Sequence, residues 1–215
     1  MELGSIIVAV IILLISAVLH EVAHGYAANF LGDPTARLAG RLTLNPARHI
    51  DPFGSVILPA LMVLLNSPVL FGYAKPVPYN PYNLRGRYGE AFVASAGALT
   101  NFGLAIVLGL LIRFFSDAFA PTFIEVVGFA VYINLMLGVF NLIPIPPLDG
   151  SKVLGGILPT GAAMRYRQFE NRMAALGPFT GFALVIMLFY LFGPIFSAGL
   201  GAVFTLLTGT SLLQL

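Results

Sequence analysis

The sequence contains no cysteine, few charged residues and three histidines among its 215 residues. Without cysteine the chain has no disulfide, no thiolate nucleophile and no cysteine-ligated zinc site. Charged residues make up 9% of the chain against 58% hydrophobic residues, and the mean hydropathy is +0.92. So apolar a composition is typical of a polytopic membrane protein. The net charge of +2 is too small to indicate a nucleic-acid partner, and any metal ligands must come from His, Asp and Glu.

The N-terminal apolar run also lacks the positive charges that precede the core of a signal peptide, because Glu2 is its one charged residue. Residues 5–19 are uncharged and lead without a break into the sequence HEVAHGYAA. We therefore expect a membrane-spanning helix over residues 5–31 rather than a cleaved leader.

The remaining apolar stretches predict an all-α polytopic membrane protein, a bundle of about 4–6 transmembrane helices. The whole chain, 1–215, is expected to form a single membrane-embedded domain. Its expected parts after the first span are a strand and re-entrant region at 37–72, core spans at 91–113 and 123–143, the LDG segment 144–151, a cytoplasmic segment 151–176 and one or two C-terminal spans in 177–213. A short strand is expected at Arg41 to Leu44, where polar and apolar residues alternate.

Residues 52–72 allow two topologies. The stretch is uncharged and long enough to cross a membrane, but Pro59, Asn66 and Pro68 interrupt it. If it crosses, the basic residues of 37–48 and 75–87 lie on opposite sides of the membrane. If it re-enters, all eleven Lys and Arg except Arg113 share one face, which agrees with the positive-inside tendency. We favour a re-entrant hairpin, whose backbone must be shielded by protein; a full crossing stays open.

His20 and His24 lie one helical turn apart, with Glu21 beside them. This HExxH spacing places two imidazoles on one helix face, where they can hold one metal ion, and supplies a glutamate to activate water. The motif alone also occurs by chance in many helices. Here the three polar groups follow a long apolar run, where each is costly unless it is paired or metal-bound, so we predict one Zn²⁺ per chain.

Asp149, in the sequence PPLDG, is the candidate third ligand. In the expected topology it follows the inner end of the 123–143 span, on the same side as the half of the first span that carries HExxH. Two histidines and one aspartate leave a fourth zinc position for water, which is the catalytic pattern, and the site is expected to open to the cytoplasm. Asp149 could instead be a turn residue or a helix N-cap. The rival ligand is His49, for which a solvated or hydrogen-bonded role in a polar loop is the simpler interpretation.

Asn141 precedes Asp149 by eight residues at the same end of its span. Its amide could donate to the substrate backbone or to a developing oxyanion, or it could join helices, as most buried asparagines in membranes do. The sequence does not choose between these roles. Asn101 and Asn134 are interpreted as helix-joining residues.

Taken together, these motifs resemble the site-2 protease family of intramembrane zinc metalloproteases, in particular its small prokaryotic members without a PDZ or CBS domain. The resemblance lies in HEVAHGYAA, GRLTLNPARHIDPFGSVILPA, YAKPVPYNP, SAGALTN and NLIPIPPLDG, which together cover most of residues 19–151. One departure is Ala98, where related sequences often have proline.

The resemblance implies a zinc metalloendopeptidase of the prokaryotic cell membrane that hydrolyses peptide bonds in or near transmembrane segments of membrane proteins. Its partners would be a transmembrane substrate and the lipid bilayer. By the same resemblance, His20, His24 and Asp149 are zinc ligands, Glu21 is the general base and Asn141 stabilises the substrate.

Two other functions remain open from the residues themselves. A metal-binding membrane transporter would also place His and Asp in membrane helices, but it would not need Glu21. A non-catalytic scaffold that binds membrane helices would need neither the metal nor the glutamate.

Overall fold

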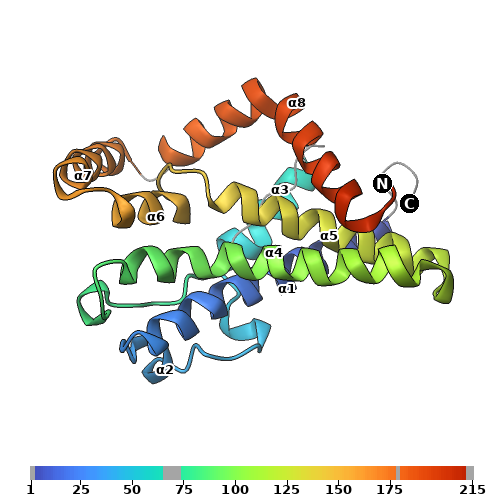
Figure 1. Ribbon diagram of the computed structural model, residues 1–215, viewed down its shortest axis with the longest axis horizontal. Helices are drawn as coiled ribbons and strands as arrows, with labels where there is room; N and C mark the ends of the chain where they lie inside the picture. Colours follow the sequence, from blue (N-terminus) through green and yellow to red (C-terminus); the bar gives the residue numbers. More distant parts are fainter. Residues whose placement is uncertain (1–2, 65–73, 178–179, 212–215) are drawn as a thin grey trace.

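The computed structural model describes residues 3–64, 74–177 and 180–211, and within these ranges the chain is helical and contains no strand. Four helices carry the long apolar runs: α1 (Leu3–Phe30), α4 (Gly89–Phe115), α5 (Pro121–Asn141) and α8 (Thr180–Thr208). Each contains a segment long and apolar enough to cross a membrane. The four run alternately in opposite directions along the length of the molecule (Figure 1).

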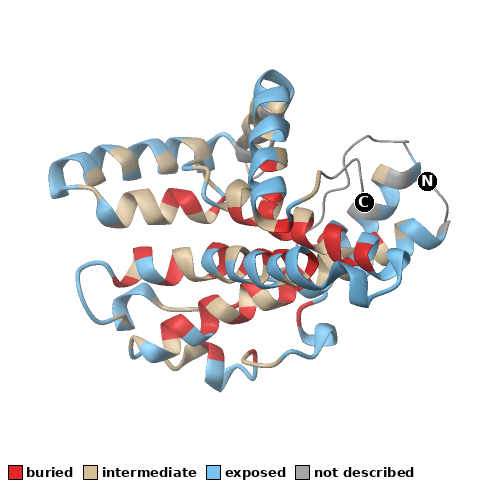
Figure 2. Cartoon of the chain, turned by 45° about the vertical axis from the view of Figure 1, so that its right-hand side comes forward, coloured by how far each residue is buried: buried red, intermediate tan, exposed pale blue. Residues whose placement is uncertain are grey.

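The central helix is α4, which packs against α1, α5 and α8 and against the short helix α6 (Asp149–Ile157). Its contact faces carry small buried residues such as Gly97, Ala98 and Ala105, which allow helices to approach closely. Buried residues concentrate where α1, α4 and α5 face one another, whereas the outer faces of the long helices are exposed (Figure 2). Exposed apolar side chains on those faces suit a lipid surrounding.

The two ends of the bundle differ in composition. The start of α1 and the end of α8 lie beside the α4–α5 connection, which contains the short helix η4 (Ser116–Ala118) (Figure 1). The opposite end carries α2 (Thr35–Leu38), α6 and α7 (Thr160–Ala175). Most of the basic residues belong to this second end.

The C-terminal apolar region forms one helix rather than a tight pair. Pro194 lies inside α8, and Figure 1 shows that the helix changes direction along its length. Proline removes a backbone donor and its ring clashes with the preceding turn, so it bends a helix without necessarily ending it. The candidate span within α8 is Tyr190–Thr208.

The expected short strand at Arg41 to Leu44 is not confirmed. These residues are irregular, and they are followed by the 3-10 turn η1 (Pro46–Arg48), the π-helical turn η2 (Pro52–Ile57) and α3 (Leu58–Leu64). A strand needs a neighbouring backbone to complete its hydrogen-bond ladder. Here the Thr43 carbonyl instead accepts a hydrogen bond from the imidazole Nε2 of His49, at 2.8 Å.

The region expected to re-enter the membrane is described only in part, since residues 65–73 lie outside the described ranges. Residues 52–64, the described part of this stretch, are helical. The chain returns close to where it left, because the Lys75 N–H donates to the His49 carbonyl at 2.8 Å.

Candidate metal centre

His20 and His24 lie on one face of α1 and are both buried, with 6% and 7% of their surface exposed. The imidazoles meet edge to face, with ring centroids 4.7 Å apart. Because four residues make about one turn of an α-helix, the motif brings both Nε2 atoms together, 3.0 Å apart.

Asp149 completes a compact cluster with the two histidines. Its Oδ2 lies 2.9 Å from His20 Nε2 and 3.2 Å from His24 Nε2. Among the described residues, these three side chains form the one group of His, Asp and Glu that could hold a metal ion. The three side chains come from α1 and from the start of α6, more than 120 residues apart in the chain.

The start of α6 directs the Asp149 carboxylate toward the histidines. Asp149 is the first residue of α6, with Leu148 at the N-cap position, so its carboxylate is not used as the cap. A Cβ atom at Gly150 would overlap the backbone of Leu142 and Ile143, so a glycine must follow the aspartate for α6 to pack this closely against that backbone.

The Nδ1 atom of each imidazole, on the side of the ring away from Nε2, donates a hydrogen bond to the protein. His24 Nδ1–H donates to the Val93 carbonyl at 2.7 Å, and His20 Nδ1–H donates to Asn101 Oδ1 at 2.6 Å. A protonated Nδ1 leaves the Nε2 lone pair available for a metal, and this arrangement is typical of metal-binding histidines.

The donor set fits a zinc ion. Tetrahedral zinc with ligand bonds of about 2.0–2.1 Å separates its ligand atoms by about 3.3 Å. The three distances within the cluster, 2.9, 3.0 and 3.2 Å, are close to that value. Imidazole nitrogen and carboxylate oxygen are both ordinary zinc ligands.

Asn101 belongs to a chain of buried hydrogen bonds that ends on His20. Its amide donates to Asn134 Oδ1 at 2.9 Å, and the amide of Asn134 donates to Ser16 Oγ at 3.0 Å. These bonds join α4, α5 and α1, as expected for helix-joining residues. The sequence indicated only the helix-joining role of Asn101 and not its contact with His20. No spacing along the chain indicates that contact, because it depends on how α4 packs against α1.

We expect Asn101→Leu to weaken zinc binding by about 10- to 100-fold, because His20 loses the acceptor that orients its ring. Equilibrium zinc binding in detergent measures the change. The matched variant Asn134→Leu breaks the bond between helices but leaves Asn101 Oδ1 free to hold His20, so it should lose less affinity. Equal losses in the two variants would mean that the network acts on packing alone.

Glu21 is half-buried beside this cluster, and its Oε2 accepts a hydrogen bond from the Val77 N–H at 2.8 Å. A cation–π contact joins α6 to residue 79, because the Lys152 ammonium lies 5.3 Å from the centre of the Tyr79 ring. Burial acts to lower the pKa of Lys152, but the neighbouring Tyr79 and Asp149 raise it above its usual value, so this residue stays cationic.

Two other candidates from the sequence are not part of the cluster. His49 is fully buried, with its Nε2 on the Thr43 carbonyl, and it is absent from the metal-binding group in the described part of the chain. Asn141 donates from its amide to the Leu137 carbonyl, one turn earlier in its own helix. Its role toward substrate stays a prediction.

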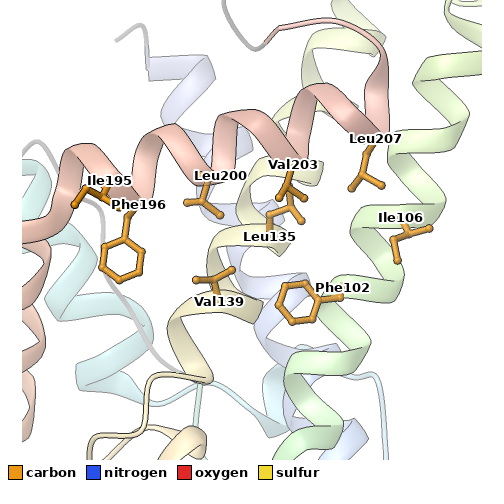
Figure 3. A pocket seen from close by; sticks show the side chains of 10 residues that line it. Phe102, Ile106, Leu135, Val139, Ile195, Phe196, Leu200, Val203 and Leu207 are labelled. Carbon is orange, nitrogen blue, oxygen red and sulfur yellow. The ribbon is translucent and has the colours of Figure 1, made fainter.

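An apolar groove of about 440 Å³ lies between α4, α5 and α8 (Figure 3). Its walls include Phe102 and Ile106 of α4, Leu135 and Val139 of α5, and Leu200 and Val203 of α8. None of its lining residues has a charged or hydroxyl side chain, so this groove can neither hold a metal nor activate water. The chemistry therefore belongs to the polar cluster between α1, α4 and α6.

The chain is similar in sequence to known proteins named as zinc metalloproteases. The family model "Peptidase family M50" matches residues 111–188, which include Asp149. A Bacillus subtilis protein named "Putative zinc metalloprotease YwhC" is 33% identical over 204 residues, covering 88% of this chain and 86% of that protein. The chain belongs to peptidase family M50.

Membership confirms the resemblance to the site-2 proteases, and this M50 peptidase is a zinc metalloprotease with the apolar helices of a multi-pass membrane protein. A Mycobacterium tuberculosis protein named "Putative zinc metalloprotease Rip2" is 32% identical over 181 residues, covering 84% of this chain but 65% of that protein. The Methanocaldococcus jannaschii protein named "Zinc metalloprotease MJ0392" is 29% identical over 184 residues, covering 83% of this chain and 41% of its own length. No solved structure matches the chain.

Proposed function

We propose that this M50 peptidase hydrolyses peptide bonds in or near transmembrane segments of other membrane proteins, at a zinc site that opens to the cytoplasm. The observation that carries the proposal is the convergence of His20, His24 and Asp149 between helices apolar enough to cross a membrane. A hydrolytic site in that position meets substrates that lie in the bilayer.

Two features of the bundle support this orientation. The hydrogen bond between Lys75 and His49 supports a re-entrant path for the chain between them, because it joins both ends of that path on one side of the membrane. All Lys and Arg residues except Arg113 then lie on that side, which the positive-inside tendency assigns to the cytoplasm. Asp149, at the start of α6, belongs to the same end.

Each residue of the site would have a separate role in the reaction. His20, His24 and Asp149 would hold the zinc, which when bound supplies a water of near-neutral pKa and polarises the scissile carbonyl. The Glu21 carboxylate would take a proton from the attacking water and return it to the leaving amine. Asn101 and the Val93 carbonyl would keep the imidazoles in orientation during this step.

The substrate must be locally unwound before it reacts. A transmembrane helix has its carbonyls engaged in helical hydrogen bonds, and these must open before a carbonyl can be attacked. The partners are therefore a membrane protein with a helix that can unwind near its cytoplasmic end, and the lipid that surrounds both proteins.

The test is cleavage of a model transmembrane helix by the purified protein in lipid vesicles, with products mapped by mass spectrometry and zinc counted per chain. We expect one zinc ion per chain, cleavage toward the cytoplasmic half of the model helix, and loss of cleavage on treatment with a chelator. Zinc-loaded protein that leaves every model helix intact would contradict the proposal and favour a transporter. Protein that holds no zinc would favour a scaffold.

A further inference from the structure

We propose that residues 74–80, here called the strap, position the catalytic carboxylate of Glu21 through the backbone N–H of Val77. The proposal rests on the role of Glu21 as the base in the proposed function. It makes Val77 a positioning residue, which acts on the reaction through Glu21.

The strap lies directly on α1 beside the base. The Val77 N–H donates to Glu21 Oε2 at 2.8 Å across 56 residues of sequence. The Val77 side chain is buried, and a Cβ atom at Gly25, one turn beyond Glu21, would lie 2.9 Å from Val77 Cγ1. A carboxylate has two oxygens, so holding one of them orients the group and leaves the other to face water.

The centre of the strap offers a single backbone donor. Its sequence is Pro76-Val77-Pro78, and proline has no N–H. The two prolines also restrict the backbone to extended conformations, which reduces the entropy lost in holding this segment in place. The Val77 N–H is therefore presented from a stiff segment.

The N-terminal end of the strap is anchored by two buried residues that have no part in the metal cluster. Arg41 Nη2 donates to the Lys75 carbonyl at 2.7 Å and to the Pro76 carbonyl at 3.3 Å. The His49 carbonyl accepts from the Lys75 N–H at 2.8 Å, and the His49 imidazole ties this loop to Thr43. Arg41 is 9% exposed and His49 is fully buried, so the bonds from Arg41 Nη2 and to the His49 carbonyl are shielded from water. Arg41 Nε and His49 Nδ1 are buried without a hydrogen-bond partner among the described residues.

Asp33 anchors the other end. It is fully buried, and its Oδ2 accepts from the Asn80 N–H at 2.6 Å while its Oδ1 accepts from the Asn83 amide at 2.9 Å. Burial acts to raise the pKa of Asp33, but its hydrogen bonds from Thr35, Asn83 and Asn80 lower it below the usual value, so it remains ionised near neutral pH. The strap is therefore anchored by hydrogen bonds on both sides of Val77, at Lys75 and at Asn80.

The decisive variant is Val77→Pro, which removes the N–H and keeps an apolar side chain in an extended segment already flanked by prolines. We expect kcat to fall about 10- to 100-fold through misplacement of Glu21, with KM and zinc affinity unchanged. Val77→Ala keeps the N–H and loses only packing, so its kcat should fall by much less. Equal kcat in the two variants, or loss of zinc in Val77→Pro, would overturn the proposal.

A second measurement does not depend on activity. Hydrogen exchange of the Val77 amide should be slow in the wild-type protein and faster in Glu21→Ala, whereas Glu21→Gln keeps an acceptor oxygen and should retain most of the protection. Unchanged exchange in Glu21→Ala would contradict the strap even if Val77→Pro fails to fold. If Glu21→Gln still cleaves substrate, the proposed function fails instead, so the two failures are distinguishable.

Discussion

Glu21→Gln is expected to lower cleavage of a membrane-helix substrate by about 10³-fold while zinc stays bound. Glutamine has nearly the size of glutamate and can still accept the Val77 N–H, but it cannot take a proton from water. The proposed zinc ligands His20, His24 and Asp149 are untouched by the change. Product formation in vesicles and zinc content per chain, measured on the same preparation, separate chemistry from metal binding.

The matched control is Asp149→Ala, which removes a ligand rather than the base. Its Oδ2 lies 2.9 Å from His20 Nε2 and 3.2 Å from His24 Nε2, so we expect zinc and cleavage to be lost together. Retained cleavage in Glu21→Gln would contradict the assignment of Glu21 as the base and would favour a metal-binding protein of another kind.

Gly97→Ala is expected to weaken zinc binding at least about 100-fold, although alanine is the better helix former. A Cβ atom at position 97 would lie 2.5 Å from His20 Nε2 and 2.6 Å from His24 Nε2. These are the two atoms that face Asp149, and a methyl group at that distance must displace them or the α4 backbone. Zinc titration and the thermal unfolding temperature, with and without zinc, measure the effect.

Gly103→Ala provides the control on the same helix. No atom lies within 4 Å of a Cβ at Gly103, so the variant should bind zinc as the wild type does and gain slightly in helix stability. Zinc affinity in Gly97→Ala equal to that of Gly103→Ala would mean that α4 can move away from the histidines without cost.

The long helices were predictable because the apolar interior of a membrane requires them. A run of about 20 apolar residues without charge must satisfy its own backbone within a membrane, and a helix does so with local bonds alone. The spans expected at 5–31, 91–113 and 123–143 correspond to α1 (Leu3–Phe30), α4 (Gly89–Phe115) and α5 (Pro121–Asn141). The same locality made the pairing of His20 with His24 predictable, since four residues along a helix always share a face.

Short segments were less predictable because partners distant in sequence decide them. Alternation at Arg41 to Leu44 favoured a strand, yet this stretch has no ladder partner in the described residues and is irregular. In the C-terminal region, Gly193 and Pro194 were compatible with either one bent helix or two helices. The structure has one bent helix, α8, which packs against α4 and α5.

By itself, the sequence determined that the chain is a membrane protein with a metal-binding motif in its first span, because composition and the HExxH spacing are local properties that need no fold to be read. The protease activity was implied by the resemblance to the site-2 protease family. The sequence also named Asp149 as the candidate third ligand, but only the tertiary structure decided how it reaches the motif and which other groups surround it. Asp149 reaches the histidines through the fold, Asn101 orients His20 from α4, Gly97 leaves room for both rings, and Val77 meets Glu21 across 56 residues. These contacts depend on how helices and loops pack against one another, and no spacing along the chain encodes them.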